Sequence, residues 1–518
     1  MSLSFHADGQ YISSIKFPDK NKEVVVDEND PSVKAANSIT AAEMKEILTV
    51  LASDEFEGRE TGFPGNERAA QFINEYYNTL NTPKVGEDNS HFQKVQFHWN
   101  SWDETKLIVN KTSYRHLWDY LSFPTRNSGM GPIHTDEVTF LGYGLEDKNY
   151  NDYRKTKIKN KVVMIYEGLP QNVTLSEKWS IEKKLSLAKS KGAKFVIVIA
   201  NNIKGLLTEN RKLLLGSSLQ LGEADKTPPT EANHIYVSSE VAENLWGKSK
   251  NKIIKARDKA LKNHKPKSVR FKTLLSINNI KNTKDLKGKN VLGFVEGSDK
   301  KEEVVVISAH YDHIGKKGDD VYNGADDNAS GTSAVMEMAE AFVQAKKDGH
   351  GPRRSILFLH VTGEEKGLLG SKFYAENPVF ALKNTVANVN VDMIGRVDKT
   401  YKDNPNYIYV IGSDRLSTDL HRINENMNAT YSQLILDYTY NSESDPNRYY
   451  FRSDHYNFAE KGIPAVFFFS GVHEDYHMST DTADKIMFDK MENVARMIFH
   501  TTWELANRDG RIIVDGKP

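Results

Sequence analysis

A chain of 518 residues with 38% hydrophobic and 27% charged residues has the composition of a globular protein and the length of roughly two to four domains. Its 69 basic and 70 acidic residues leave a formal net charge of −1, which argues against a nucleic-acid binder or a membrane-surface binder. Cysteine is absent, so disulfides, thiolate catalysis and cysteine-ligated metal sites are excluded.

The N-terminal part predicts an arm followed by two helices and two strands. Residues 1–38 are polar and are expected to form an extended N-terminal arm. Thr40 and Glu43 have the spacing of a capping box, so a helix is expected to begin there and to run to about Leu51. A second helix is expected after Gly65, and strands are expected at 92–99 and 105–110. We assign 39–114 to the N-terminal part of the main domain.

Residues 115–278 are expected to form a separate inserted domain. Its expected strands are 138–144, 161–166, 194–200 and 234–238, and its expected helices are 181–190 and a short one ending near Trp246. The lysine-rich stretch 248–267 closes this domain and is interpreted as a solvated face.

Residues 279–518 alternate between strand and helix patterns. This alternation predicts an α/β fold with a mixed, mostly parallel sheet flanked by helices. The expected strands are 291–295, 303–309, 355–360, 385–391, 407–411 and 465–469, and the expected helices include 331–345, 367–375 and 484–508.

Histidines and carboxylates recur in this region where the expected strands end. The motifs are His310-Tyr-Asp312, the loop 323–331 with Asp326 and Asp327, the pair Glu364-Glu365, Asp392, and the segment 475–485 with His477. Because ligands gather at the carboxyl ends of strands in an open α/β sheet, we expect these side chains to meet at one edge. They supply two histidines and three carboxylates for metals and a spare carboxylate base, which is the inventory of a two-metal hydrolytic site.

One of these loops also fits a different kind of metal site. Asp326, Asn328, Ser330, Gly331 and Glu337 have the spacing of an EF-hand calcium loop. The residues before the loop are rich in glycine, so the incoming helix is missing, and a serine occupies the eighth loop position. A calcium-binding structural protein is therefore the weaker alternative.

The order and spacing of all five motifs resemble those of the co-catalytic dizinc aminopeptidases. This family includes bacterial leucyl and arginyl aminopeptidases and has glutamate carboxypeptidase and the transferrin receptor as relatives. The resemblance covers about 39–110 and 280–510, and 51–65 is similar to the N-terminal segment of the family. Residues 115–278 resemble, more loosely, the β-rich protease-associated domain that is often inserted in this family. The resemblance implies the zinc-exopeptidase, phosphorylase/hydrolase-like fold.

The resemblance also implies two zinc ions and five protein ligands. Asp327 would bridge the two ions. His310 and Asp392 would complete one zinc site, and Glu365 and His477 would complete the other.

Further roles follow from the same resemblance. Glu364 would be the general base, and Asp312 would orient His310. Tyr450 matches a tyrosine that stabilises the oxyanion in some relatives, although Tyr449 is its neighbour. The residues not expected to bind metal are Asp326, His313 and His473.

The implied function is that of a zinc-dependent exopeptidase. An aminopeptidase is expected, which removes N-terminal residues from peptides through a zinc-bridging hydroxide. A carboxypeptidase or dipeptidase on the same scaffold stays open, because Arg396 or Arg452 could bind a free carboxylate. A non-catalytic, receptor-like binding protein is disfavoured, because all five ligands and Glu364 are present.

The expected partners are peptides with a free N-terminus. Neither nucleic acid nor a membrane span is expected, since no run approaches the ~18 apolar residues that a span needs. The oligomeric state is open. The first residues lack the basic and apolar regions of a signal peptide. Since relatives with this insert are commonly exported, we expect a periplasmic or secreted protein whose signal peptide has been removed.

Overall fold

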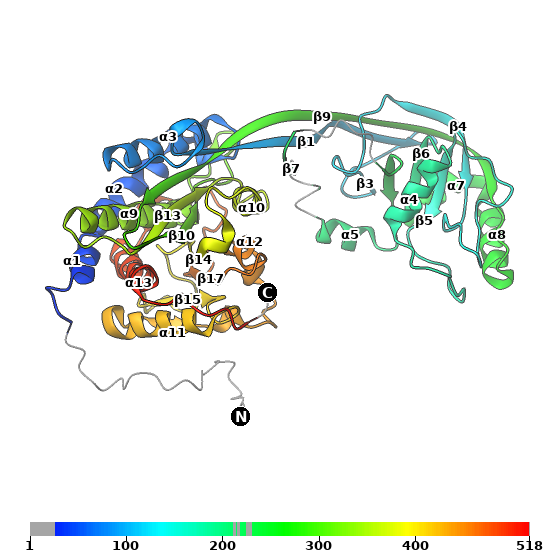
Figure 1. Cartoon of the computed structure of the whole chain (residues 1–518). Coiled ribbons are helices and arrows are strands. Elements are labelled where there is room, and N and C mark those ends of the chain that lie inside the picture. The colour runs from blue at the N-terminus through cyan, green and yellow to red at the C-terminus, as the bar shows by residue number, and fades with distance from the viewer. Residues whose placement is uncertain (1–25, 211–213, 215–217, 224–229, 517–518) are drawn as a thin grey trace. The chain divides into compact units, whose positions relative to one another are not determined.

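The structure is a computed structural model that describes residues 26–210, 214, 218–223 and 230–516. The chain divides into two compact units. Unit 1 comprises the described residues up to Gln96 and those from Leu286 onward, and unit 2 comprises Phe97–Asp285. Strands β1 (Phe92–Val109) and β9 (Val269–Val295) each continue from one unit into the other (Figure 1).

The prediction of an extended arm is wrong for its last residues, which form helix α1 (Pro31–Asn37). Asp30 caps this helix by accepting a hydrogen bond from the backbone N–H of Ser32, and Pro31 suits the first turn. The buried side chains of Val33, Ala35 and Ala36 lie on this short helix, which contacts α9 (Gly331–Lys347) and α13 (Phe488–Asn507). Residues 1–25 of the arm lie outside the described part of the chain.

The next two helices confirm the prediction. Helix α2 (Ala41–Leu51) begins after Thr40, whose side chain accepts a hydrogen bond from the backbone N–H of Glu43. Helix α3 (Pro64–Thr79) follows. The two strands expected at 92–99 and 105–110 are one continuous strand, β1.

Unit 1 contains the predicted mixed, mostly parallel sheet. Its strands follow the order β16 (Ile435–Asp437), β15 (Tyr407–Ile411), β17 (Ala465–Phe469), β14 (Thr385–Val391), β10 (Lys300–His310), β13 (Arg354–Val361) and β9. The four central strands β17, β14, β10 and β13 are parallel, whereas β15 pairs antiparallel with β17 and β9 pairs antiparallel with β13. The carboxyl ends of the four parallel strands therefore lie at one edge of the sheet.

Alternate residues of the central strands belong to two different cores. In β10, Val305 and Ile307 join a cluster with residues of α2, α3, α9 and α13. Val304 and Val306 join a second cluster with residues of α10 (Leu369–Glu376) and α12 (His455–Ala459). Because successive side chains in a strand point to opposite faces, helices cover both faces of this sheet.

Unit 2 contains the residues expected as the inserted domain and extends beyond them along β1 and β9. Strands β4 (Ile133–Phe140), β5 (Val162–Tyr166), β6 (Phe195–Ile199) and β8 (His234–Val237) pair in parallel, and β4 pairs antiparallel with β9. Its helices include α4 (Ile181–Ser190), α5 (Ile203–Glu209), α7 (Ser239–Trp246) and α8 (Lys250–Asn263). The lysine-rich stretch is thus largely helical, and the unit contains many strands as well as helices. Its identification as a protease-associated domain stays a prediction.

No helix in the described part of the chain is both long enough and apolar enough to cross a membrane.

Gly293 of β9 marks a close approach between the sheet and α3. A β-carbon at this position would lie 2.1 Å from Cε1 of Tyr77. We expect Gly293→Ala to lower the free energy of unfolding by about 1–3 kcal/mol, because the buried ring has to shift. Chemical denaturation measures this change. The matched control is Gly510→Ala, since nothing lies within 4 Å of a β-carbon there. Equal stability of the two variants would show that Tyr77 moves aside without cost.

Candidate metal centre

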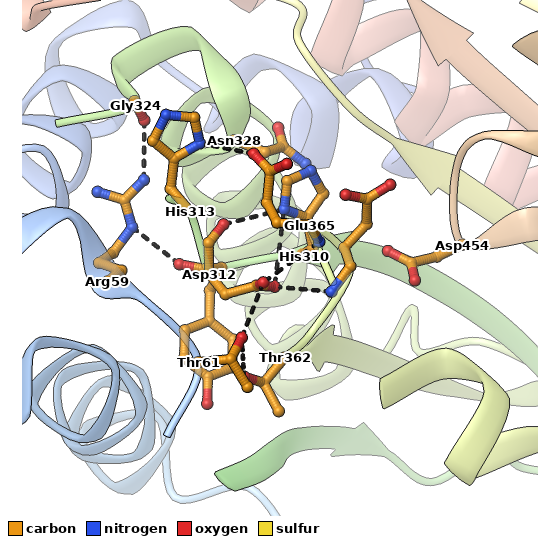
Figure 2. Close-up of polar contacts among 12 residues, drawn as sticks. Arg59, Thr61, His310, Asp312, His313, Gly324, Asn328, Thr362, Glu365 and Asp454 are labelled. Carbon is orange, nitrogen blue, oxygen red and sulfur yellow. Dashed lines mark hydrogen bonds and ion pairs between the residues drawn. The ribbon is translucent and has the colours of Figure 1, made fainter. Parts of the chain in front are cut away.

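The predicted ligands come from loops that follow the four parallel strands. His310 is the last residue of β10, and Asp392 directly follows β14. Glu364 and Glu365 lie in the loop after β13, and His477 lies in the loop after β17. The structure brings all of them, together with Asp327, into two adjoining groups of metal-ligand atoms, part of which Figure 2 shows.

The first group comprises His313, Asp327, Glu365 and His477, whose ligand atoms all lie within 4.8 Å of one another. His477 Nε2 is 3.1 Å from Asp327 Oδ2 and 3.0 Å from Glu365 Oε1. His313 Nδ1 is 2.9 Å from the same Glu365 oxygen. The group therefore includes His313, which the sequence analysis left out of the ligand set.

The second group comprises His310, Glu364 and Asp392. His310 Nε2 lies 3.4 Å from Asp392 Oδ1 and 3.3 Å from Asp327 Oδ1. Asp327 therefore presents Oδ1 to this group and Oδ2 to the first one. A carboxylate with one oxygen on each side is placed as a bridge between two ions.

The donor atoms fit a metal in number and kind. Glu365 Oε1, His477 Nε2 and His313 Nδ1 are buried and have no hydrogen-bond partner, although they lie close together. Burying several carboxylates side by side is unfavourable unless a positive charge compensates them. Zinc takes imidazole nitrogens and carboxylate oxygens, so the residues present fit a zinc centre.

The pKa values of the two neighbouring glutamates are shifted in opposite directions. Burial raises the pKa of Glu364 well above its ordinary value, and the charges of Glu365 and Asp454 add to this effect. Burial also acts on Glu365, but His313 and His477 hold its pKa down at about 2. Adjacent carboxyl groups whose pKa values are pushed apart suit separate roles, one as a proton carrier and one as a ligand.

Asp312 orients His310 differently from the prediction. His310 Nδ1 lies 3.1 Å from the backbone carbonyl of Asp312 but 3.9 Å from its carboxylate. The carboxylate instead accepts hydrogen bonds from Thr61 Oγ1 at 2.9 Å and from the backbone N–H of Glu364 at 3.1 Å (Figure 2). The side chain of Asp312 therefore holds the glutamate loop, and its main chain holds the histidine.

Two supporting residues have no assigned role in the sequence analysis. Asp481 accepts hydrogen bonds from the backbone N–H groups of Asp326 and Asp327, and Ser453 Oγ donates to Asp392 Oδ2 at 2.7 Å. Asp326 itself accepts from the backbone N–H of Gly395 and lies outside both ligand groups. Asp481 was visible only as part of the His477 motif, and a lone serine offers no recognisable signal.

Arg59 is a third residue of this kind, and it is fully buried. Its guanidinium donates to the backbone carbonyls of Leu51, Tyr311, Asn323 and Gly324 at 2.6–2.8 Å. Figure 2 shows it between the segment that carries Asp312 and the glycine that precedes the Asp327 loop. The N-terminal segment thus ties together two of the loops that carry the ligands.

A pocket opens beside the second group. Besides His310, Asp327, Glu364 and Asp392, it is lined by Met393, Tyr449, Arg452, Phe467, Phe469, Val472 and Tyr476. Its walls thus combine apolar and aromatic side chains with carboxylates, and Arg452 is also among its lining residues.

The assignment of Tyr450 is corrected by the structure. Its side chain is only 5% exposed, lies 4.2 Å below the guanidinium of Arg415 and belongs to the core instead of the pocket lining. Tyr449 lines the pocket in its place. The short 3₁₀ helix Tyr449–Phe451 turns neighbouring side chains in different directions, which the residue spacing alone does not reveal.

The two arginines considered for carboxylate binding differ in their surroundings. Arg396 forms an ion pair with Asp475 at 3.1 Å, so its charge is already compensated. Arg452 lines the pocket, with its guanidinium 4.8 Å from the ring centre of Tyr449.

Comparison with known proteins agrees with this geometry. Residues 290–502 match the model of peptidase family M28. A probable leucine aminopeptidase of Arthroderma otae is 33% identical over 214 residues, which cover 40% of this chain and 55% of that protein. A probable zinc metalloprotease of Pyrenophora teres f. teres is 29% identical over 259 residues, which cover 42% of this chain and 51% of that protein. The chain thus spans about half the length of the curated relatives it matches.

One solved structure matches over almost the whole chain. It is an aminopeptidase from Aneurinibacillus sp. strain AM-1, with a TM-score of 0.56 and 18% identity, and the match covers 94% of this chain and 98% of that one. At this identity the likeness shows the fold.

The buried contacts of Arg59 predict a large effect on stability. Arg59→Met would leave backbone carbonyls without partners, so we expect the free energy of unfolding to fall by about 3 kcal/mol or more. Arg68→Met is the control, because Arg68 is 44% exposed in its ion pair with Glu57 and such pairs contribute about 1 kcal/mol or less. Thermal and chemical denaturation measure both variants. Similar losses in the two variants would contradict the role of Arg59.

Proposed function

Because residues 290–502 match the model of peptidase family M28, we propose that this chain is a zinc-dependent aminopeptidase with two zinc ions. The observation that carries the proposal is the position of Asp327, whose two oxygens face two separate groups of ligand atoms. Glu364, a carboxyl group with a raised pKa, lies beside this bridge.

We assign the ligands accordingly. His310 and Asp392 would hold one zinc, Glu365 and His477 would hold the other, and Asp327 would contact both. When bound, the zinc ions supply Lewis-acid activation of a water molecule and of the scissile carbonyl.

The residues of the chain handle the protons. Glu364, which lies in the group of His310 and Asp392, accepts the proton of the attacking water and returns it to the leaving amine. The backbone N–H of Glu364 is held by the carboxylate of Asp312, which keeps the base in place. Tyr449 takes the oxyanion role that was expected of Tyr450, because it lines the pocket.

The pocket supports a free-amine substrate with an apolar side chain. Asp392 and Glu364 supply carboxyl groups that a free amine could contact, and Met393, Phe467 and Phe469 offer apolar contact area to the side chain of the N-terminal residue. The curated relative from Arthroderma otae carries the name leucine aminopeptidase, which accords with this preference.

One observation favours a second candidate, a carboxypeptidase or dipeptidase. Arg452 lines the pocket, and its guanidinium could receive a substrate carboxylate. Arg396 is a poorer candidate because Asp475 already compensates its charge.

Two substitutions separate the base from the bridge. We expect Glu364→Gln to keep its zinc and to lose about 10²–10⁴-fold in kcat, because the proton carrier is removed. Asp327→Asn should lose zinc, because an amide bridges two cations poorly. Metal analysis and steady-state kinetics measure both effects. A near-normal kcat in Glu364→Gln, or two retained zinc ions in Asp327→Asn, would each refute the corresponding role.

The substrate class is tested with aminoacyl anilides whose amine is free or N-acetylated. We expect chelator-sensitive cleavage of the free-amine substrates alone, fastest with leucine, phenylalanine or methionine. If protein that holds its zinc cleaves none of these substrates, the assignment changes to a dipeptidase or a carboxypeptidase. In that case Arg452→Gln should abolish the cleavage of substrates with a free carboxylate.

A further inference from the structure

His313 lies in the loop after β10, three positions beyond His310. Its side chain is fully buried, and neither ring nitrogen has a hydrogen-bond partner. Buried polar groups in proteins are normally hydrogen-bonded, so an imidazole with two unpartnered nitrogens calls for an explanation. Missing partners alone do not identify a ligand, because both ring nitrogens of the buried His455 also lack hydrogen-bond partners. The groups that surround His313 therefore decide its role.

The surroundings of His313 Nδ1 match those of a predicted zinc ligand. Nδ1 lies 2.9 Å from Glu365 Oε1 and 3.8 Å from Asp327 Oδ2. His477 Nε2 lies 3.0 Å and 3.1 Å from the same two oxygens. Both nitrogens are close to these oxygens, yet neither is aligned with them as a hydrogen-bond donor. Neither nitrogen is therefore committed to one of these oxygens as a hydrogen-bond donor.

The separations fit ligands of a single ion. Nitrogen and oxygen ligands lie about 2.0–2.2 Å from zinc, so neighbouring ligands of a tetrahedral ion are roughly 3.4 Å apart. The contacts of His313 and His477 with the two carboxylates span 2.9 to 3.8 Å. The rings of His313 and His477 meet edge to face at 5.6 Å between their centres, which leaves both nitrogens free to face the carboxylates.

We propose that His313 is a sixth protein ligand of the metal centre and binds through Nδ1 the zinc that Glu365, His477 and Asp327 also hold. The inference rests on the proposed function for the presence of zinc and adds a ligand to it. It makes the two sites unequal, with four protein ligands in one and three in the other. Closed four-ligand sites are typical of structural zinc, whereas catalytic sites keep a position open. The site of His310 and Asp392 is therefore the one that stays open to substrate.

A ligand exchange tests the proposal in a chain that has no cysteine. In His313→Cys the new thiol is the only one, so a thiolate bound to cobalt gives a sulfur-to-cobalt charge-transfer band that the wild-type protein lacks. We expect this band when cobalt replaces zinc in His313→Cys. His473→Cys is the matched control, because His473 contacts Asp326 but lies outside both ligand groups, and it should lack the band.

A second variant keeps the test decisive if a thiol at this position disturbs folding. His313→Phe retains a ring of similar size but has no donor atom. We expect a chelator to remove the zinc of the four-ligand site from this variant at a concentration roughly tenfold lower than the wild type requires. Cobalt bound to His313→Cys without the band, or zinc held by His313→Phe as tightly as by the wild type, would overturn the proposal. A wild-type chain that binds neither zinc nor cobalt would instead refute the proposed function.

Discussion

The mutual repulsion of Asp327, Glu364, Glu365 and Asp392 is the constraint on which the rest of this centre depends. Four carboxyl groups share one edge of the sheet, where Asp327 and Asp392 are buried and Glu364 and Glu365 are partly buried, so water screens them poorly. Two responses are built into the chain. Glu364 has a raised pKa that favours the protonated form, whereas Asp327 and Glu365 face histidines and, in our proposal, cations. The charge distribution that makes the edge unfavourable without metal is the same one that selects a divalent cation.

Main-chain groups hold this arrangement as much as side chains do. Asp481 accepts the N–H groups of the bridging loop, Asp312 accepts that of the base, and Arg59 donates to carbonyls on both sides. These contacts fix backbone positions, so the ligand side chains keep short, well-defined paths to the ions. Residues that never touch a substrate thus set the precision of the site.

The sequence allowed the sheet, its order of motifs and the grouping of the five ligands to be predicted, because most of the motifs lie at or shortly after the end of a strand and are therefore local in the chain. The features that the sequence did not reveal depend on which way a side chain points and on contacts between residues far apart in the chain. The choice between Tyr449 and Tyr450 depends on the turn of a short helix, and the inclusion of His313 depends on contacts with residues far along the chain. Helix α1 was missed because its buried face is only a few residues long.

The ligands come from the ends of separate strands, so metal binding is coupled to folding. His310, Glu365, Asp392 and His477 follow four different strands, so only the folded sheet assembles them. An ion that binds the folded chain alone shifts the folding equilibrium in proportion to the logarithm of its free concentration. Because Asp327 faces both groups, occupancy of one site also orders a ligand of the other. The supply of free metal would then govern how long the chain resists unfolding, as well as whether it can act.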